Sequence, residues 1–149
     1  CSEVLEHIKD SVSLLFEANR LLVNDGHLLL TIPNGYGPKE WESFLHSFLA
    51  RYLKNRKNRK KVESYLEQFS ADSLNTSPHI NFFTIRSIKE VLTHAGFKIL
   101  STRNRRFLGG PYSSAFIRKH QLLIDLNVSL ADYLPSFAVS GWMFVCCKV

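Results

Sequence analysis

Acidic and imidazole side chains are concentrated near the beginning of the chain, where Glu3, Glu6 and His7 occur in one short stretch. Residues three or four positions apart share a face of a helical turn, so Glu3 would lie beside Glu6 or His7 if this stretch is helical. Imidazole titrates near neutral pH and serves as a general base, and both side-chain types bind metal ions. We therefore expect Glu3 and His7 to be catalytic residues.

A second group of candidate residues follows an apolar run and reads Pro-Asn-Gly-Tyr-Gly. The Gly-x-Gly at 35–37 is not a dinucleotide-binding loop, because the position of the third glycine holds Glu40. We expect Asn34, Gly35 and Tyr36 to contact a ligand. The alternative is a Pro-Asn-Gly turn without a function of its own.

The apolar pattern predicts the elements that would position these residues. One helix is expected after the N-cap Asp10 and another from Thr84, and a third helix contains the leucines between 122 and 130. The predicted strands are 27–32, 97–102 and 142–149. This order is that of an alternating α/β chain.

The strand 27–32 is apolar on both faces, which predicts a sheet covered by helices on both sides. Open α/β sheets bind ligands at the carboxyl ends of their strands. The segments expected to form a pocket are therefore 2–7, 33–37 and 103–111.

A helical insert is predicted over 40–69, with Trp41, Phe44 and Phe48 on one face. These aromatic residues fit a helix core better than a ligand pocket. Seven of the basic residues lie between Arg51 and Lys61, which favours a solvated helix end, with binding of nucleic-acid phosphates as the alternative.

The composition of the 149 residues, 45% of them hydrophobic, is sufficient for one compact domain with a core. The sequence contains neither a long apolar segment nor a signal-peptide pattern, which predicts a soluble, cytoplasmic protein without a membrane span. Cys1, Cys146 and Cys147 have neither disulfide-framework nor zinc-site spacing, and we interpret them as packing residues.

Three segments resemble the second half of the class I S-adenosylmethionine (SAM)-dependent methyltransferase domain, in the branch that includes the ubiquinone-biosynthesis O-methyltransferases. The most specific segment is SEVLEHI at 2–8, with EANRLLVNDGHLLLTIPN at 17–34. The others are HINFFTIRSIKEVLTHAGFKI at 79–99 and GWMFVCCKV at 141–149. The resemblance implies a partial Rossmann-like methyltransferase sheet of family strands 4 to 7, the last antiparallel, flanked by helices.

The same resemblance implies that SAM is the cofactor and that Cys1, Ser2 and Glu3 are among the residues that bind it. It also implies a small-molecule methyl acceptor near Asn34, Gly35 and Tyr36. The family's glycine-rich SAM loop and its ribose-binding acid precede the matched region. Residues 1–149 are therefore expected to be the C-terminal portion of a single methyltransferase domain. As a fragment without the cofactor-loop half, this polypeptide alone is expected to be inactive and to bind SAM weakly or not at all.

Glu-x-x-Glu-His with a later histidine also resembles the magnesium-binding set of small-RNA 2′-O-methyltransferases. This resemblance implies that Glu3, Glu6, His7 and His79 hold Mg²⁺, which would lower the pKa of an acceptor hydroxyl. The alternative is that these residues shape the pocket or pair locally, since histidine is an unusual magnesium ligand.

The expected function is O-methylation of a small molecule. One alternative is a catalytically inactive methyltransferase-like binding module. The other is an RNA 2′-O-methyltransferase, which would use the basic stretch and the metal set. The sequence leaves the oligomeric state open.

Overall fold

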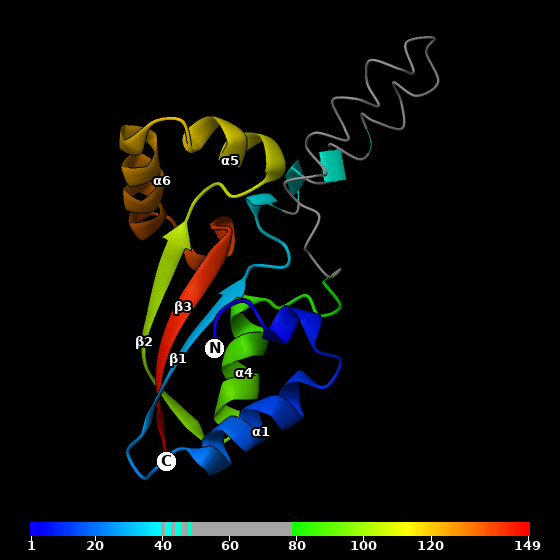
Figure 1. Ribbon diagram of the computed structural model, residues 1–149, viewed down its shortest axis with the longest axis vertical. Coiled ribbons are helices and arrows are strands. Elements are labelled where there is room, and N and C mark those ends of the chain that lie inside the picture. Colours follow the sequence, from blue (N-terminus) through cyan, green and yellow to red (C-terminus); the bar gives the residue numbers. More distant parts are fainter. Residues whose placement is uncertain (40, 43, 46–47, 49–78) are drawn as a thin grey trace.

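The computed structural model describes residues 1–39, 41–42, 44–45, 48 and 79–149 (Figure 1). Its elements, in chain order, are η1 (Leu5–His7), α1 (Ser11–Leu21), β1 (His27–Pro33), α4 (Ile85–His94), β2 (Phe97–Arg106), α5 (Pro111–Ile117), α6 (Gln121–Tyr133), η2 (Ser136–Ala138) and β3 (Gly141–Lys148). Most of the predicted insert 40–69, including the basic stretch, lies outside the described residues. Trp41, Phe44 and Phe48 are helical as predicted but exposed, so they do not pack in the core.

The three strands form one sheet in the order β1-β3-β2, and β3 is antiparallel to both neighbours. The strands β1 and β2 therefore run in the same direction. An additional parallel bridge joins Ser2 to Thr31 of β1, so the chain start lies along the free side of that strand. The predicted α/β class and the antiparallel last strand are both confirmed.

One face of the sheet carries the core. On this face Leu30 pairs with Phe144 and Ile32 with Trp142, and all four side chains are fully buried. The helices α1 and α4 lie on one side of the sheet (Figure 1) and contribute the buried side chains Leu15, Ile88 and Leu92 to the same cluster.

The prediction that the first strand is covered on both faces is wrong at Leu29, which is 53% exposed. Successive strand side chains point to opposite faces, so Leu29 points away from Leu30 and the core. The unbroken apolar run suggested two buried faces, but the described residues bury only one of them at this position.

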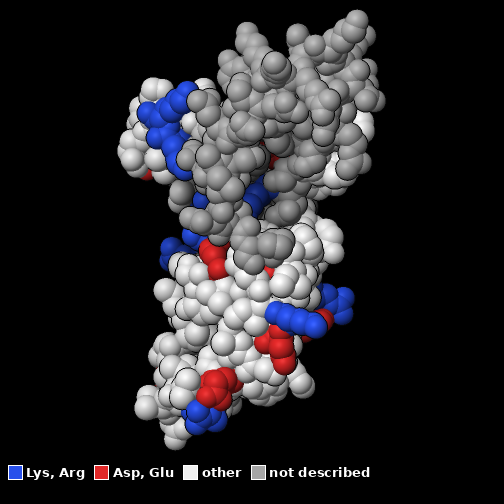
Figure 2. All heavy atoms as spheres, turned by 45° about the vertical axis from the view of Figure 1, so that its right-hand side comes forward, with Lys and Arg blue, Asp and Glu red and all other residues white. Residues whose placement is uncertain are grey.

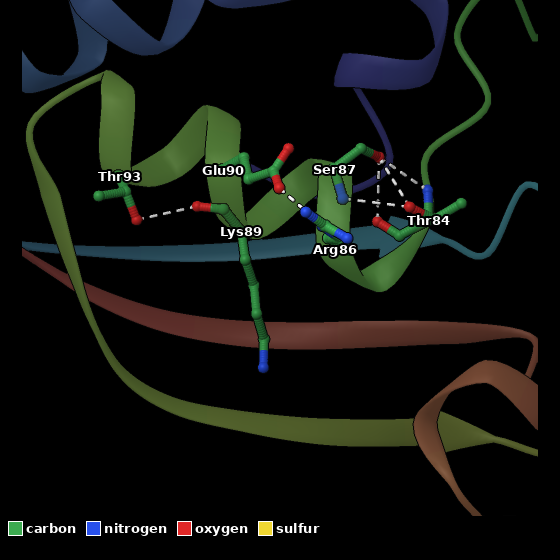
Figure 3. A network of polar contacts seen from close by, with 6 residues as sticks. All are labelled: Thr84, Arg86, Ser87, Lys89, Glu90 and Thr93. Atoms are coloured by element: carbon green, nitrogen blue, oxygen red, sulfur yellow. Dashed lines mark hydrogen bonds and ion pairs between the residues drawn. The ribbon is translucent and has the colours of Figure 1, made fainter.

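The predicted N-cap Asp10 and the predicted helix start at Thr84 are confirmed. The Asp10 carboxylate accepts a hydrogen bond from the Ser13 amide and begins α1. Thr84 and Ser87 form a reciprocal capping box at the start of α4, beside an Arg86–Glu90 ion pair on its surface (Figure 3). Each side-chain cap contributes about 1 kcal/mol to helix stability.

The strand β2 extends four residues beyond its predicted end at Thr102 and reaches Arg106. Its pairing with β3 is irregular between Ile99 and Ser101 and again between Asn104 and Arg106. Such bulges leave one residue unpaired and redirect its side chain, here Arg105. The helix α5, which begins at a proline, was not predicted.

The cysteines differ in their surroundings. Cys146 is fully buried in the core, as expected of a packing residue, and Cys147 is partly buried. Cys1 is exposed, so its interpretation as a packing residue is wrong. Among the described residues, no helix is long and apolar enough to cross a membrane.

Candidate functional site

The segment from Cys1 to Glu3 is held against β1 by the backbone of Thr31. The Thr31 amide donates to the Cys1 carbonyl (2.9 Å), and the Glu3 amide donates to the Thr31 carbonyl (3.0 Å). The hydroxyls of Ser2 and Thr31 are hydrogen-bonded at 2.8 Å. Glu3 has a φ of +53°, an uncommon conformation for a residue with a side chain, and here the chain turns away from β1 into η1.

The carboxylate of Glu3, a predicted catalytic and cofactor-binding residue, forms an ion pair with the guanidinium of Arg105. Both side chains are 32% exposed. Arg105 occupies the bulge of β2 described above, and it lies 102 positions from Glu3 in the sequence. Sequence reasoning singled out the segment 103–111 but not this residue, because nothing local indicates the pairing.

His79 is brought to η1 by the backbone that follows it. The amides of Ile80 and Asn81 both donate to the carbonyl oxygen of Glu6, at 2.7 and 3.1 Å. The Asn81 side-chain amide donates to the carbonyls of Leu5 (3.0 Å) and Ile8 (2.7 Å) on either side. Asn81, which the sequence analysis did not identify, therefore positions His79 near Glu6.

Glu6, His7 and His79 form a compact cluster whose potential ligand atoms all lie within 4.8 Å of one another. The Nε2 atom of His7 is 3.8 Å from Oε1 of Glu6. The rings of His7 and His79 meet edge to face, with centroids 5.1 Å apart. The predicted metal residue Glu3 is outside this group, since its carboxylate is bonded to Arg105.

Two members of this cluster, Glu6 and His7, have buried polar atoms without hydrogen-bond partners. Glu6 is 1% exposed, and neither of its carboxylate oxygens has a hydrogen-bond partner, nor does Nδ1 of His7. Burial, with a smaller contribution from the nearby Glu3, raises the pKa of the Glu6 carboxyl above its ordinary value. Buried polar atoms without partners are rare in proteins and call for an explanation, such as a bound ion or a catalytic role.

The predicted ligand-contact residues follow β1 and have different roles in the fold. The side-chain amide of Asn34 donates to the carbonyls of Phe137 (2.9 Å) and Val139 (2.8 Å), so it is committed to the structure. Gly35 packs so closely on Phe82 that an added Cβ would approach its backbone to 2.8 Å. Tyr36, 65% exposed, is the one of the three predicted residues whose side chain is accessible to a ligand.

Comparison with known sequences identifies the family. Residues 1–102 match the family described as "Methyltransferase domain", which is more than half of the chain. The chain belongs to this family. A search of curated proteins found no match.

Two solved structures show a similarity to this chain. An S-adenosylmethionine-dependent methyltransferase from Mesorhizobium loti has 15% sequence identity and a TM-score of 0.49, with 99% of this chain and 59% of that one covered. PKMT2 from Rickettsia typhi, solved in complex with AdoHcy, has 14% identity and the same TM-score of 0.49, with 99% and 34% covered. The chain thus spans about three fifths and one third of their respective lengths.

Proposed function

We propose that these residues belong to a SAM-dependent methyltransferase that methylates a hydroxyl group of a small molecule. Membership of the methyltransferase-domain family supports methyl transfer as the activity. The observation that supports an ionisable acceptor is the buried, unpartnered carboxylate of Glu6 beside His7 and His79. A hydroxyl must lose its proton during methylation, and this cluster supplies groups that accept protons.

The protein's own residues have distinct parts in this proposal. Cys1 and Ser2 are exposed beside the end of β1 and are accessible to the cofactor, as is the neighbouring turn at Glu3. The acceptor oxygen attacks the methyl carbon, so that a C–O bond forms as the C–S bond of the sulfonium breaks. The acceptor proton passes to His7 or Glu6. Tyr36 contacts the acceptor, and Arg105 fixes the orientation of Glu3.

The cluster also fits a divalent cation. Glu6, His7 and His79 would hold it, and the lack of hydrogen-bond partners at Glu6 supports this fit. Two imidazoles and one carboxylate favour Mn²⁺, Fe²⁺, Co²⁺ or Zn²⁺ over Mg²⁺, which prefers oxygen ligands. A bound cation would lower the pKa of an acceptor hydroxyl. Glu3, the fourth metal ligand predicted from the sequence, joins these three residues only if its carboxylate separates from Arg105.

The test is transfer of a tritiated methyl group from SAM to a fractionated pool of small phenols, catechols and alcohols, using the protein at its full natural length. We expect His7→Ala to reduce kcat at least 100-fold, consistent with loss of a general base. The control is His27→Gln, since His27 is exposed at the opposite end of β1 from Pro33 and should leave kcat unchanged.

Two outcomes would contradict this proposal. If no hydroxyl compound is methylated but RNA is, and the transfer depends on the cluster, then the acceptor class is wrong. If SAM and acceptor bind without any transfer, the protein is a binding module instead.

A further inference from the structure

A cavity of about 420 Å³ lies between the end of β2, α5 and α6. Three arginines, Arg105, Arg106 and Arg118, contribute to its lining, and none of the described residues that line it is acidic. In the lower half of the surface in Figure 2, by contrast, both basic and acidic side chains are present. The cavity is therefore a half-open pocket whose lining carries an excess of positive charge.

The guanidinium of Arg106 has no direct partner among the described residues, although the carboxylate of Glu3 is near enough to offset part of its charge. Arg105 is paired with Glu3, and Arg118 donates to the carbonyl of Ser114 within its own helix (3.2 Å). The Arg106 side chain is partly buried and has neither a hydrogen bond nor an ion pair among the described residues. Burial, and next the nearby Arg105, lower the pKa of Arg106, although a guanidinium stays charged at neutral pH. An unpaired, partly desolvated cation of this kind favours an anion from outside.

The remaining wall of the cavity is largely apolar. Ile117 from α5 and Ile124 and Val128 from α6 contribute to it. Asn127 fixes this wall to the chain after β2, because it accepts from the Leu108 amide (2.8 Å) and donates to the Leu108 carbonyl (2.9 Å). The polar atoms of Asn127 are thus used in holding the two sides together.

We infer that this cavity binds a small amphipathic anion, with a carboxylate or phosphate at Arg106 and an apolar body against α5 and α6. A guanidinium binds either group through paired N–H donors. Arg105 both lines the cavity and bonds to Glu3 of the candidate site. In this respect the inference rests on the proposed function, because it assigns the bound anion as the methyl acceptor or a part of it.

Binding is tested by calorimetry with octanoate, octyl phosphate and octan-1-ol, in the absence of SAM. We expect both anions to bind at least 10-fold more tightly than octan-1-ol. The anion that binds more tightly indicates whether the hydroxyl-bearing acceptor carries a carboxylate or a phosphate as its charged group. Arg106→Gln should raise the Kd of the anions at least 10-fold, and Arg106→Lys should recover part of the affinity.

The matched control is Arg86→Gln, which removes the same charge from the 88% exposed side chain on α4 and should leave the Kd unchanged. The unfolding midpoint of each variant establishes that it folds. Ile124→Ser should weaken the binding of octanoate and of octan-1-ol to a similar degree, because it alters the apolar wall against which both alkyl chains would lie.

The inference is overturned if octan-1-ol binds as tightly as the anions, or if Arg106→Gln leaves their Kd unchanged. It is also overturned if a short RNA competes at lower concentration than octyl phosphate, since the cavity would then be part of a nucleic-acid surface. None of these measurements requires turnover, so failure here leaves the proposed methyl transfer standing. Conversely, anion binding by a protein that cannot transfer methyl groups would contradict only the proposed function.

Discussion

The imidazole of His7 stands edge-on to that of His79, with ring centroids 5.1 Å apart and an interplanar angle of 64°. The two histidines are 72 positions apart in the sequence. Their proximity depends on the amides of Ile80 and Asn81. Both amides donate to the carbonyl oxygen of Glu6, the residue before His7 in η1. Two imidazoles in this arrangement, with the buried Glu6, give the first prediction.

We expect a transition-metal ion to stabilise the protein and Mg²⁺ to have little effect. At 100 times the Kd, a bound ion stabilises the folded state by about 2.7 kcal/mol, which raises Tm by about 5–10 °C. Thermal unfolding with Mn²⁺, Zn²⁺ or Mg²⁺ measures this shift. His79→Ala should abolish it, and His94→Ala on the surface of α4 should not. Equal shifts in both variants would exclude the cluster as the metal site.

Glu6→Gln should stabilise the metal-free protein at neutral pH, because it removes a buried carboxylate that has no hydrogen-bond partner and is destabilised by burial. The pKa of Glu6 is raised by burial, so below the ordinary carboxyl pKa the group is protonated in both states and has no effect. As the pH rises, the carboxyl of the unfolded chain ionises first. The stability of the wild-type protein therefore falls until the pH has passed the pKa of Glu6 in the folded protein.

The difference between variant and wild type should therefore grow as the pH rises above the ordinary carboxyl pKa and level off beyond the folded pKa, reaching about 1–3 kcal/mol. Denaturant unfolding with a chelator present measures it, and subtraction cancels the contributions of other groups. The same variant should lose the metal-induced rise in Tm. A difference that stays constant as the pH rises through the ordinary carboxyl pKa and beyond would contradict the raised pKa of Glu6 in the folded protein.

Asn34→Ala should destabilise the protein by about 2–3 kcal/mol, because it leaves the carbonyls of Phe137 and Val139 without their donor. The matched control is Asn19→Ala, which loses one side-chain bond to the Gly96 carbonyl and should cost about 1 kcal/mol. Urea unfolding compares the two. If Asn34→Ala costs no more than the control, the Asn34 amide is not the main link between β1 and the chain before β3.

Cys146 should resist alkylation by iodoacetamide at pH 8, since burial raises the pKa of its thiol to about 11 and the side chain is fully enclosed. Cys1 is exposed and should react first. Mass spectrometry of peptides after timed labelling gives the order, and urea should remove the difference. Early labelling of Cys146 in the absence of urea would indicate that β3 opens readily.

Much of the fold could be predicted from the sequence because its signals are local. The starts of α1 and α4 at Asp10 and Thr84 and the apolar strands each depend on neighbouring residues. The end of β2 could not be predicted in this way, since its polar last residues are tolerated only through bulges and contacts with α6. The exposure of Leu29 could not be predicted from the unbroken apolar run either, because burial of a strand face depends on which elements pack against it.

In the candidate site, too, local sequence determined one part and the tertiary structure decided another. The sequence by itself determined which chemistry is available, because Glu3, Glu6 and His7 are neighbours whose side chains accept protons or bind metals. Only the tertiary structure decided which of them act together: it placed His79 beside Glu6 and His7, and it paired Glu3 with Arg105. Those partners come from distant segments, and their positions are set by backbone hydrogen bonds and a strand bulge that residue types alone do not specify.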